Sequence, residues 1–116
     1  MRNTTTNLSQ SFKETFDGGK IRDELTRTGK VIREKAKKAG DAIADATSNA
    51  RITAVIKSKL VHDSGLAAFK IDVDTTDGVV TLSGNVSSPE EIAKAMELVL
   101  ATEGVHKVVS TLQDKP

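Results

Sequence analysis

The feature that most constrains this chain is a pair of alternating segments joined by a tight turn, between residues 69 and 86. The first segment has an apolar residue at every second position, the period of a half-buried strand: Phe69, Ile71 and Val73. Asp77-Gly78 follows, and both residues tolerate the positive φ angles of a two-residue hairpin turn. The second segment alternates in the same way: Val80, Leu82, Gly84 and Val86. The sequence therefore predicts an antiparallel hairpin with one buried face.

A helix is predicted on each side of this hairpin. Before it, Ser48 or Asn49 can cap a helix whose apolar residues recur at helical spacing: Ile52, Val55, Ile56 and Leu60. After it, Ser88-Pro89-Glu90-Glu91 is a capping box with proline at the first helical position. The apolar stripe of this second helix ends before Gly104: Ile92, Ala95, Met96 and Val99. A last strand is predicted with a bulge, because its apolar residues do not alternate strictly: Val105, Val108, Val109 and Leu112.

The elements follow one another as helix, strand, strand, helix and strand. A crossover through the second helix makes the third strand parallel to the second. We therefore expect an α+β fold of αββαβ order, in which two helices cover one face of a three-stranded mixed sheet.

Several stretches resemble the BON domain family: Ala50-Arg51-Ile52-Thr53-Ala54-Val55-Ile56-Lys57, Ile71-Asp72-Val73-Asp74, Asp77-Gly78-Val79-Val80-Thr81-Leu82-Ser83-Gly84-Asn85-Val86, and the closing Gly104-Val105 with Val108. The resemblance covers residues 50–113, and its most specific element is the second strand of the hairpin. It implies the αββαβ fold in a bacterial envelope or osmotic-stress protein. It also implies attachment to phospholipid membranes or envelope components, no catalytic activity and a periplasmic location. Residues 1–19 contain no apolar core of the kind a secretory signal needs, so a cytoplasmic location is the alternative.

The first half of the chain differs from the second in charge. Residues 1–50 carry 10 Lys and Arg against 7 Asp and Glu, whereas residues 51–116 carry 7 against 9. Residues 1–19 are polar and predict a flexible tail that ends at Gly18-Gly19. Residues 20–49 predict a basic amphipathic helical stem, interrupted by Gly29 and Gly40, with small and apolar residues at helical spacing: Ile21, Leu25, Ile32, Ala36, Ala39, Ile43 and Ala46. The domain then occupies residues 50–113.

The basic residues suggest what the chain binds. Candidates for contact with anionic phospholipid headgroups lie on the first domain helix and on the stem: Arg51, Lys57, Lys59, Arg33, Lys35, Lys37 and Lys38. Each such residue contributes about 1 kcal/mol near an anionic surface, so the attachment is expected to be reversible and salt-sensitive. An envelope protein is the other expected partner. The alternative is a protein-interaction or stress-protection adaptor that forms a homo-oligomer through residues 20–49, and an ordinary solvated helix face also accounts for these cations.

Other functions find little support in the sequence. There is no cysteine and no G-x-S-x-G motif, so nucleophilic catalysis is not expected, and neither is a cofactor. The acidic run from Asp72 to Gly78 departs from the EF-hand spacing, and His62 is interpreted as facing the carbonyl end of its helix, so no metal site is expected. Few aromatic residues and a net negative domain argue against nucleic-acid binding. No apolar run is long enough to span a membrane.

Overall fold

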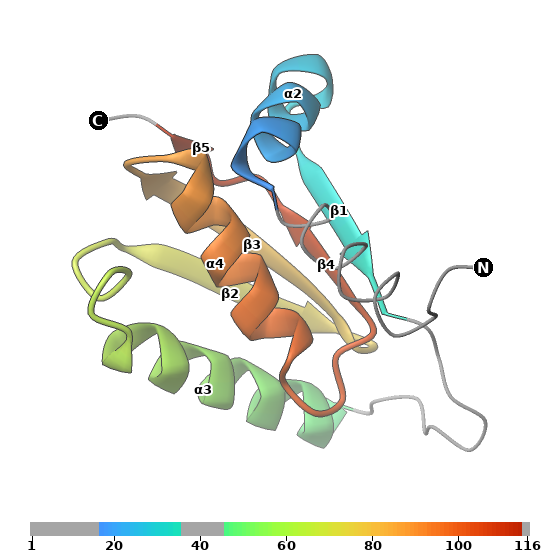
Figure 1. Ribbon diagram of the computed structural model, residues 1–116. Helices are drawn as coiled ribbons and strands as arrows, with labels where there is room; N and C mark the ends of the chain where they lie inside the picture. Colours follow the sequence, from blue (N-terminus) through green and yellow to red (C-terminus); the bar gives the residue numbers. More distant parts are fainter. Residues whose placement is uncertain (1–16, 36–45, 115–116) are drawn as a thin grey trace, which may run out of the picture.

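The computed structural model describes residues 17–35 and 46–114, in which three helices pack against a mixed sheet. The helices are α2 (Gly18–Thr28), α3 (Ala46–His62) and α4 (Pro89–Leu100). The strands are β1 (Val31–Glu34), β2 (Ile71–Thr76), β3 (Val79–Val86), β4 (Lys107–Ser110) and β5 (Gln113–Asp114). The sheet has the order β1-β4-β3-β2, and β5 pairs with the far end of β3 (Figure 1).

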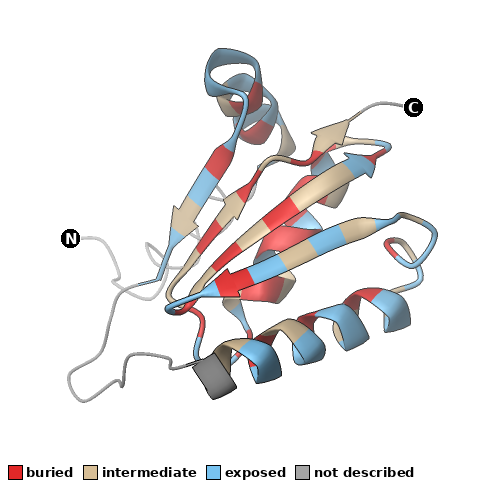
Figure 2. Ribbon diagram, turned by 180° about the vertical axis from the view of Figure 1, so that it is seen from behind, coloured by how far each residue is buried: buried red, intermediate tan, exposed pale blue. Residues whose placement is uncertain are grey.

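The predicted α+β fold is confirmed. β2 and β3 pair antiparallel across a turn in which Asp77 and Gly78 have φ angles of 51° and 77°. β3 and β4 are parallel, as a crossover through α4 requires. α4 lies across one face of the sheet, and the view from behind shows the strands of the other face (Figure 2). α3 was expected on the same face as α4, but it runs along the β2 edge of the sheet and packs against β2 and α4.

The predicted capping box at the start of α4 forms in part, because the return bond of Glu91 goes to Ser87 and not to the N-cap residue Ser88. Ser88 is the N-cap, and its side chain accepts a hydrogen bond from the backbone N–H of Glu91 at 3.4 Å. The Glu91 carboxylate in turn accepts from the backbone N–H of Ser87 at 2.7 Å. Pro89 occupies the first helical position, where no intrahelical N–H is needed.

A single helix over residues 20–49 is a wrong prediction. α2 ends at Thr28 because Gly29 adopts the left-handed conformation, with φ 77°, and its N–H donates to the Leu25 carbonyl at 2.8 Å. Residues 31–34 then form β1, which pairs antiparallel with β4, so the sheet is wider than the three strands expected. Gly18-Gly19 was expected to end a flexible tail but forms the first turn of α2, whose N-cap is Asp17. Residues 1–16 and 36–45 lie outside the described residues.

The predicted last strand is two strands. β4 ends at Ser110 and β5 begins at Gln113, and both strands pair parallel with β3. Between them the Thr111 N–H donates to the Leu82 carbonyl at 2.8 Å, so the chain stays beside β3 through the break. The irregular apolar spacing therefore marks a break between two short strands on the same neighbour rather than a bulge within one strand.

The core lies between the sheet and the helices. Its largest fully buried side chains come from all three helices, from β3, from the loop after α3 and from the segment between β4 and β5: Ile21, Ile56, Leu66, Leu82, Ile92, Met96 and Leu112. Val31 of β1 is also fully buried, so α2 and β1 belong to the same core as the predicted domain. The helical spacing places Val55 in the buried stripe of α3, but its side chain is 38% exposed because it lies at the edge of that stripe.

Candidate functional site

α3 combines exposed apolar side chains with cations. Three large apolar side chains are exposed in the described part of the chain, and two of them, Val55 and Val61, belong to α3. Val61 is 68% exposed. Arg51 and Lys57 are exposed on the same helix. A pocket opens on each side of α3, so this helix is the strongest candidate for a binding surface.

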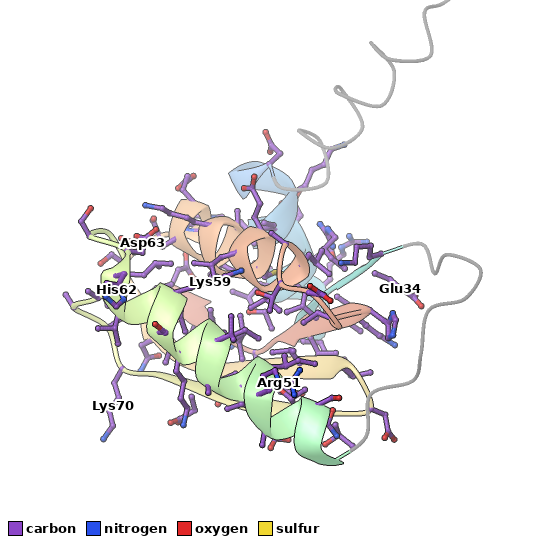
Figure 3. The ribbon with its side chains drawn as sticks, turned by 90° about the horizontal axis from the view of Figure 1, so that it is seen from below. Glu34, Arg51, Lys59, His62, Asp63 and Lys70 are labelled. Carbon is purple, nitrogen blue, oxygen red and sulfur yellow. The ribbon has the colours of Figure 1, made fainter. Side chains whose placement is uncertain are left out.

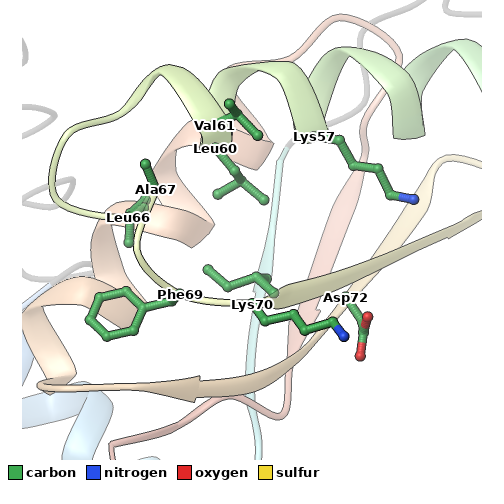
Figure 4. Close-up of a pocket in the computed structure, with 9 residues that line it drawn as sticks. Lys57, Leu60, Val61, Leu66, Ala67, Phe69, Lys70 and Asp72 are labelled. Atoms are coloured by element: carbon green, nitrogen blue, oxygen red, sulfur yellow. The ribbon is translucent and has the colours of Figure 1, made fainter.

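The first pocket, called here the α3–β2 pocket, lies between the second half of α3 and the start of β2 (Figure 4). Its volume is about 300 Å³. Most of its lining is apolar, and two lysines and an aspartate complete it: Leu60, Val61, Leu66, Ala67, Phe69, Ile71, Lys57, Lys70 and Asp72. Figure 4 shows Leu60 pointing from α3 toward the start of β2, above Lys70.

Asp63 holds the loop that forms one wall of this pocket. Its Oδ1 accepts hydrogen bonds from the backbone N–H groups of Gly65, at 2.9 Å, and Leu66, at 3.1 Å. Lys94 of α4 lies 3.0 Å from the same oxygen. The hydrogen bond from Lys94 is the largest influence on the pKa of Asp63, and together with the two backbone N–H groups it lowers that pKa, against the opposing effect of burial.

The second pocket, called here the α3–Thr102 pocket, lies between the first half of α3 and the loop that follows α4. Its volume is about 370 Å³, and its lining is more polar: Ser48, Arg51, Ile52, Val55, Lys59, Thr102, Glu103 and Gly104. The Lys59 ammonium donates to Thr102 Oγ1 at 2.9 Å, and the Thr102 hydroxyl donates to the Leu98 carbonyl at 3.0 Å. Lys59 therefore joins α3 to the end of α4.

The three cations predicted on α3 lie on different sides of the helix. Arg51 and Lys59 line the α3–Thr102 pocket, whereas Lys57 lines the α3–β2 pocket. Seen from below, Lys59 lies between α3 and α4, Arg51 lies along α3, and Lys70 lies on the opposite side from Lys59 (Figure 3). Arg51 and Lys57 are thus the exposed members of the predicted set on this helix, while Lys59 is half-buried.

The cations predicted on the stem have other surroundings. Arg33 and Lys35 were expected on the polar face of a helix, but Arg33 lies in β1 and Lys35 follows it. The two Arg33 NH groups donate to the Glu24 carboxylate at 2.8 and 2.5 Å, and the Arg33 side chain is only 12% exposed. The Lys35 ammonium donates to the Leu100 carbonyl at 2.9 Å, at the C-terminal end of α4. Lys37 and Lys38 lie outside the described residues.

Two further observations concern metals and membranes. His62 Nδ1 lies 2.7 Å from the Ser58 carbonyl, so the ring faces the carbonyl end of α3 as predicted. Within residues 17–35 and 46–114, no three metal-ligating side chains gather into a cluster. None of the helices in these two ranges is long and apolar enough to cross a membrane.

Sequence reasoning missed Lys70. In the sequence, Lys70 is one polar residue of an alternating strand pattern, and nothing in that pattern predicts that it lies opposite Lys57. The fold brings the two lysines to one pocket because α3 packs against β2 and the chain returns through the loop at Asp63. The proximity of Lys57 and Lys70 therefore depends on how α3 packs against β2, which the sequence pattern does not predict.

Comparison with known proteins identifies similar sequences for the C-terminal part of the chain. A family model described as the BON domain matches residues 48–115. Osmotically-inducible protein Y of Escherichia coli (strain K12) is 40% identical over 63 residues. That alignment covers 54% of this chain and 31% of the relative, so the chain matches less than a third of that protein's length.

Proposed function

This chain belongs to the BON domain family, and from that premise we propose that it is a non-catalytic module that attaches reversibly to anionic phospholipid surfaces of the bacterial envelope. The name of its E. coli relative supports a role under osmotic stress. An envelope location, the periplasm, is part of the same proposal. Because the chain matches only part of that relative, the main support for the proposed membrane attachment is the surface of α3.

The observation that carries the proposal is the exposed side of α3. Arg51 and Lys57 lie on its two flanks, and the exposed Ala54 and Ser58 between them are small. A helix that lies flat on a membrane brings both flanking cations to the headgroups. The exposed Val61 adds apolar surface near one end of the same helix.

The expected strength is modest. Each of the two exposed cations contributes about 1 kcal/mol near an anionic surface, which corresponds to about a fivefold gain in affinity for each. Arg51 and Lys57 together therefore contribute about a thirtyfold gain at low salt, and this gain is screened as the salt concentration rises.

The test is co-sedimentation of the full chain with vesicles. Phosphatidylglycerol-containing and pure phosphatidylcholine vesicles are compared across a range of salt concentrations. We expect binding to the anionic vesicles at low salt, and a loss of about thirtyfold in affinity for Arg51→Gln with Lys57→Gln. The matched control, Arg27→Gln with Lys30→Gln, removes the same charge from exposed residues at the end of α2 and should bind nearly as well as the unmodified chain.

Two results would contradict the proposal. Equal losses in the two double variants would mean that net charge, not α3, controls binding. Sedimentation with neither type of vesicle would favour the alternative, an adaptor that associates with proteins through residues 20–49. In that alternative the contact must use residues other than Ile21 and Leu25, because both are buried in the core.

A further inference from the structure

We propose that the α3–β2 pocket binds one free anionic amphiphile with a single alkyl chain, such as a fatty-acid carboxylate, with the headgroup between Lys57 and Lys70. The inference rests on the proposed function, since it assigns a ligand of lipid chemistry to the same helix. It goes further in naming a pocket, a ligand class and a binding event that needs no bilayer.

The walls of the pocket suit an alkyl chain. Leu60 and Leu66 are 6% and 1% exposed and form its inner part, while Phe69 and Ile71 are half-buried. Val61 at the rim is 68% exposed, so a bound chain would cover apolar surface that is now open to water. The lining thus has the apolar majority and few polar groups that are typical of small-molecule sites.

Contacts between α3 and β2 close the pocket at one end, and the loop between these two elements closes it at the other. Thr53 Oγ1 donates to Thr75 Oγ1 at 2.8 Å, which joins α3 to β2 near the middle of the helix. At the other end, Asp63 holds the loop that returns from α3 to β2. A volume of about 300 Å³ between these two closures lies at the lower limit for ligand pockets and favours one chain over the two chains of a phospholipid.

The charges at the pocket favour an anionic headgroup. Lys57 comes from α3 and Lys70 from the residue before β2, so the two ammonium groups reach the pocket from facing elements (Figure 4). Within the described residues, neither ammonium group has an ion-pair or hydrogen-bond partner. Asp72 is the single carboxylate in the lining, which leaves the pocket with a net positive charge. A carboxylate or phosphate headgroup is complementary to this pair of lysines.

The test uses sodium decanoate below its micelle concentration, titrated into the isotopically labelled full chain and followed by NMR. We expect saturable shifts in the residues that line the pocket, at millimolar decanoate or below. Lys57→Gln with Lys70→Gln should weaken decanoate binding about tenfold. Decyltrimethylammonium has the same alkyl chain but a cationic headgroup, so it should bind the unmodified protein no more tightly than decanoate binds this double variant. Equal binding of the two amphiphiles, or shifts confined to other surfaces, would overturn the proposal.

A second pair of variants tests the pocket without changing any charge. Ala67 is exposed and lines the pocket, so Ala67→Leu places a larger side chain in it with little cost to folding. We expect this variant to lose decanoate binding, whereas Ala54→Leu, the same exchange on the outer side of α3, keeps it. Unchanged decanoate binding in Ala67→Leu would overturn the pocket assignment.

Vesicle binding separates this inference from the proposed function. Ala67→Leu should bind anionic vesicles as the unmodified chain does, and Arg51→Gln, on the other side of α3, should bind decanoate normally. Vesicle binding without decanoate binding would contradict the pocket alone. Decanoate binding without vesicle binding would contradict the membrane proposal alone. A tenfold loss of vesicle binding in Ala67→Leu would mean that the pocket takes its chain from the bilayer, against the assignment to a free amphiphile.

Discussion

Gly84 is the residue whose identity the fold constrains most directly. It has a φ angle of +129°, and a Cβ atom at this position would lie 2.6 Å from the Lys70 carbonyl oxygen. L residues rarely adopt this φ angle, and an added Cβ would collide with the carbonyl oxygen, so only glycine fits here. The glycine in the most specific stretch of the family resemblance is therefore needed where β3 passes the start of β2, beside the α3–β2 pocket.

Gly84→Ala should destabilise the protein by about 3 kcal/mol or more, because backbone strain and a collision with main chain add together. Urea denaturation measures the loss. The matched control is Gly29→Ala, where φ is also positive, at 77°, but no atom lies within 4 Å of the added Cβ. That control should lose only about 1 kcal/mol. Equal losses in the two variants would show that the contact with Lys70 is unimportant.

Asp63 makes the stability of the protein sensitive to acid. Its pKa is lowered in the folded state from the ordinary value of 3.8, so its contribution is fully present above that value and is lost as the pH falls through the folded pKa. Asp63→Asn should therefore be less stable at neutral pH and should show a shallower loss of stability below about pH 4. Urea unfolding midpoints across this range test the prediction, with Asp74→Asn, on the exposed side of β2, as the control. An unchanged pH slope in Asp63→Asn would contradict it.

Arg33 is predicted to stabilise the fold and to contribute nothing to membrane attachment. Its guanidinium joins β1 to α2 through two hydrogen bonds to Glu24, and its side chain is 12% exposed. Arg33→Gln should lower the free energy of unfolding by about 2 kcal/mol, the range for charge-assisted hydrogen bonds in partly buried positions. Vesicle binding should be unchanged under conditions where the variant is folded. A normal stability with weaker vesicle binding would reverse the assignment.

At the scale of elements, local chemistry explains what the sequence could predict. The Asp77-Gly78 turn and the Ser88 cap each depend on residues within four positions, so both can be recognised before the fold is known. β1 was missed because it is short and lies within a stretch of helical spacing, and its partner β4 lies more than 70 residues away. The candidate site likewise has one part that the sequence predicts and one part that it does not. The cations of α3 follow from the sequence, but the pocket shared by Lys57 and Lys70 depends on how the elements pack.

The pair formed by α2 and β1 is predicted to be part of the folding unit. Ile21, Leu25 and Val31 are each at most 8% exposed, and full burial of such a side chain contributes roughly 1.5–3 kcal/mol. Removal of residues 1–35 should therefore cost roughly 5 kcal/mol, a large part of the stability of a small domain. Thermal unfolding of the 36–116 fragment tests this. A midpoint equal to that of the full chain would show that the family-matched region is stable alone.

At the scale of the whole molecule, the two ends of the fold face different directions. α2 lies at one end of the sheet, beside β1, and α3 lies at the other end, beside β2 (Figure 1). A flat membrane that contacts the outer side of α3 therefore leaves α2 in water. This arrangement predicts a single orientation on the membrane, in which the exposed residues of α2 make no contact with lipid.

The most direct measurement uses the absence of cysteine from the chain. Ser58→Cys on the outer side of α3 and Thr26→Cys on α2 are exposed positions that each accept an environment-sensitive fluorophore in the full chain. With phosphatidylglycerol vesicles at low salt, the label at position 58 should shift to shorter wavelengths and the label at position 26 should not. High salt should reverse the shift, because the attraction is electrostatic. A shift at position 26 alone, equal shifts at both positions or no shift at either would contradict attachment through α3.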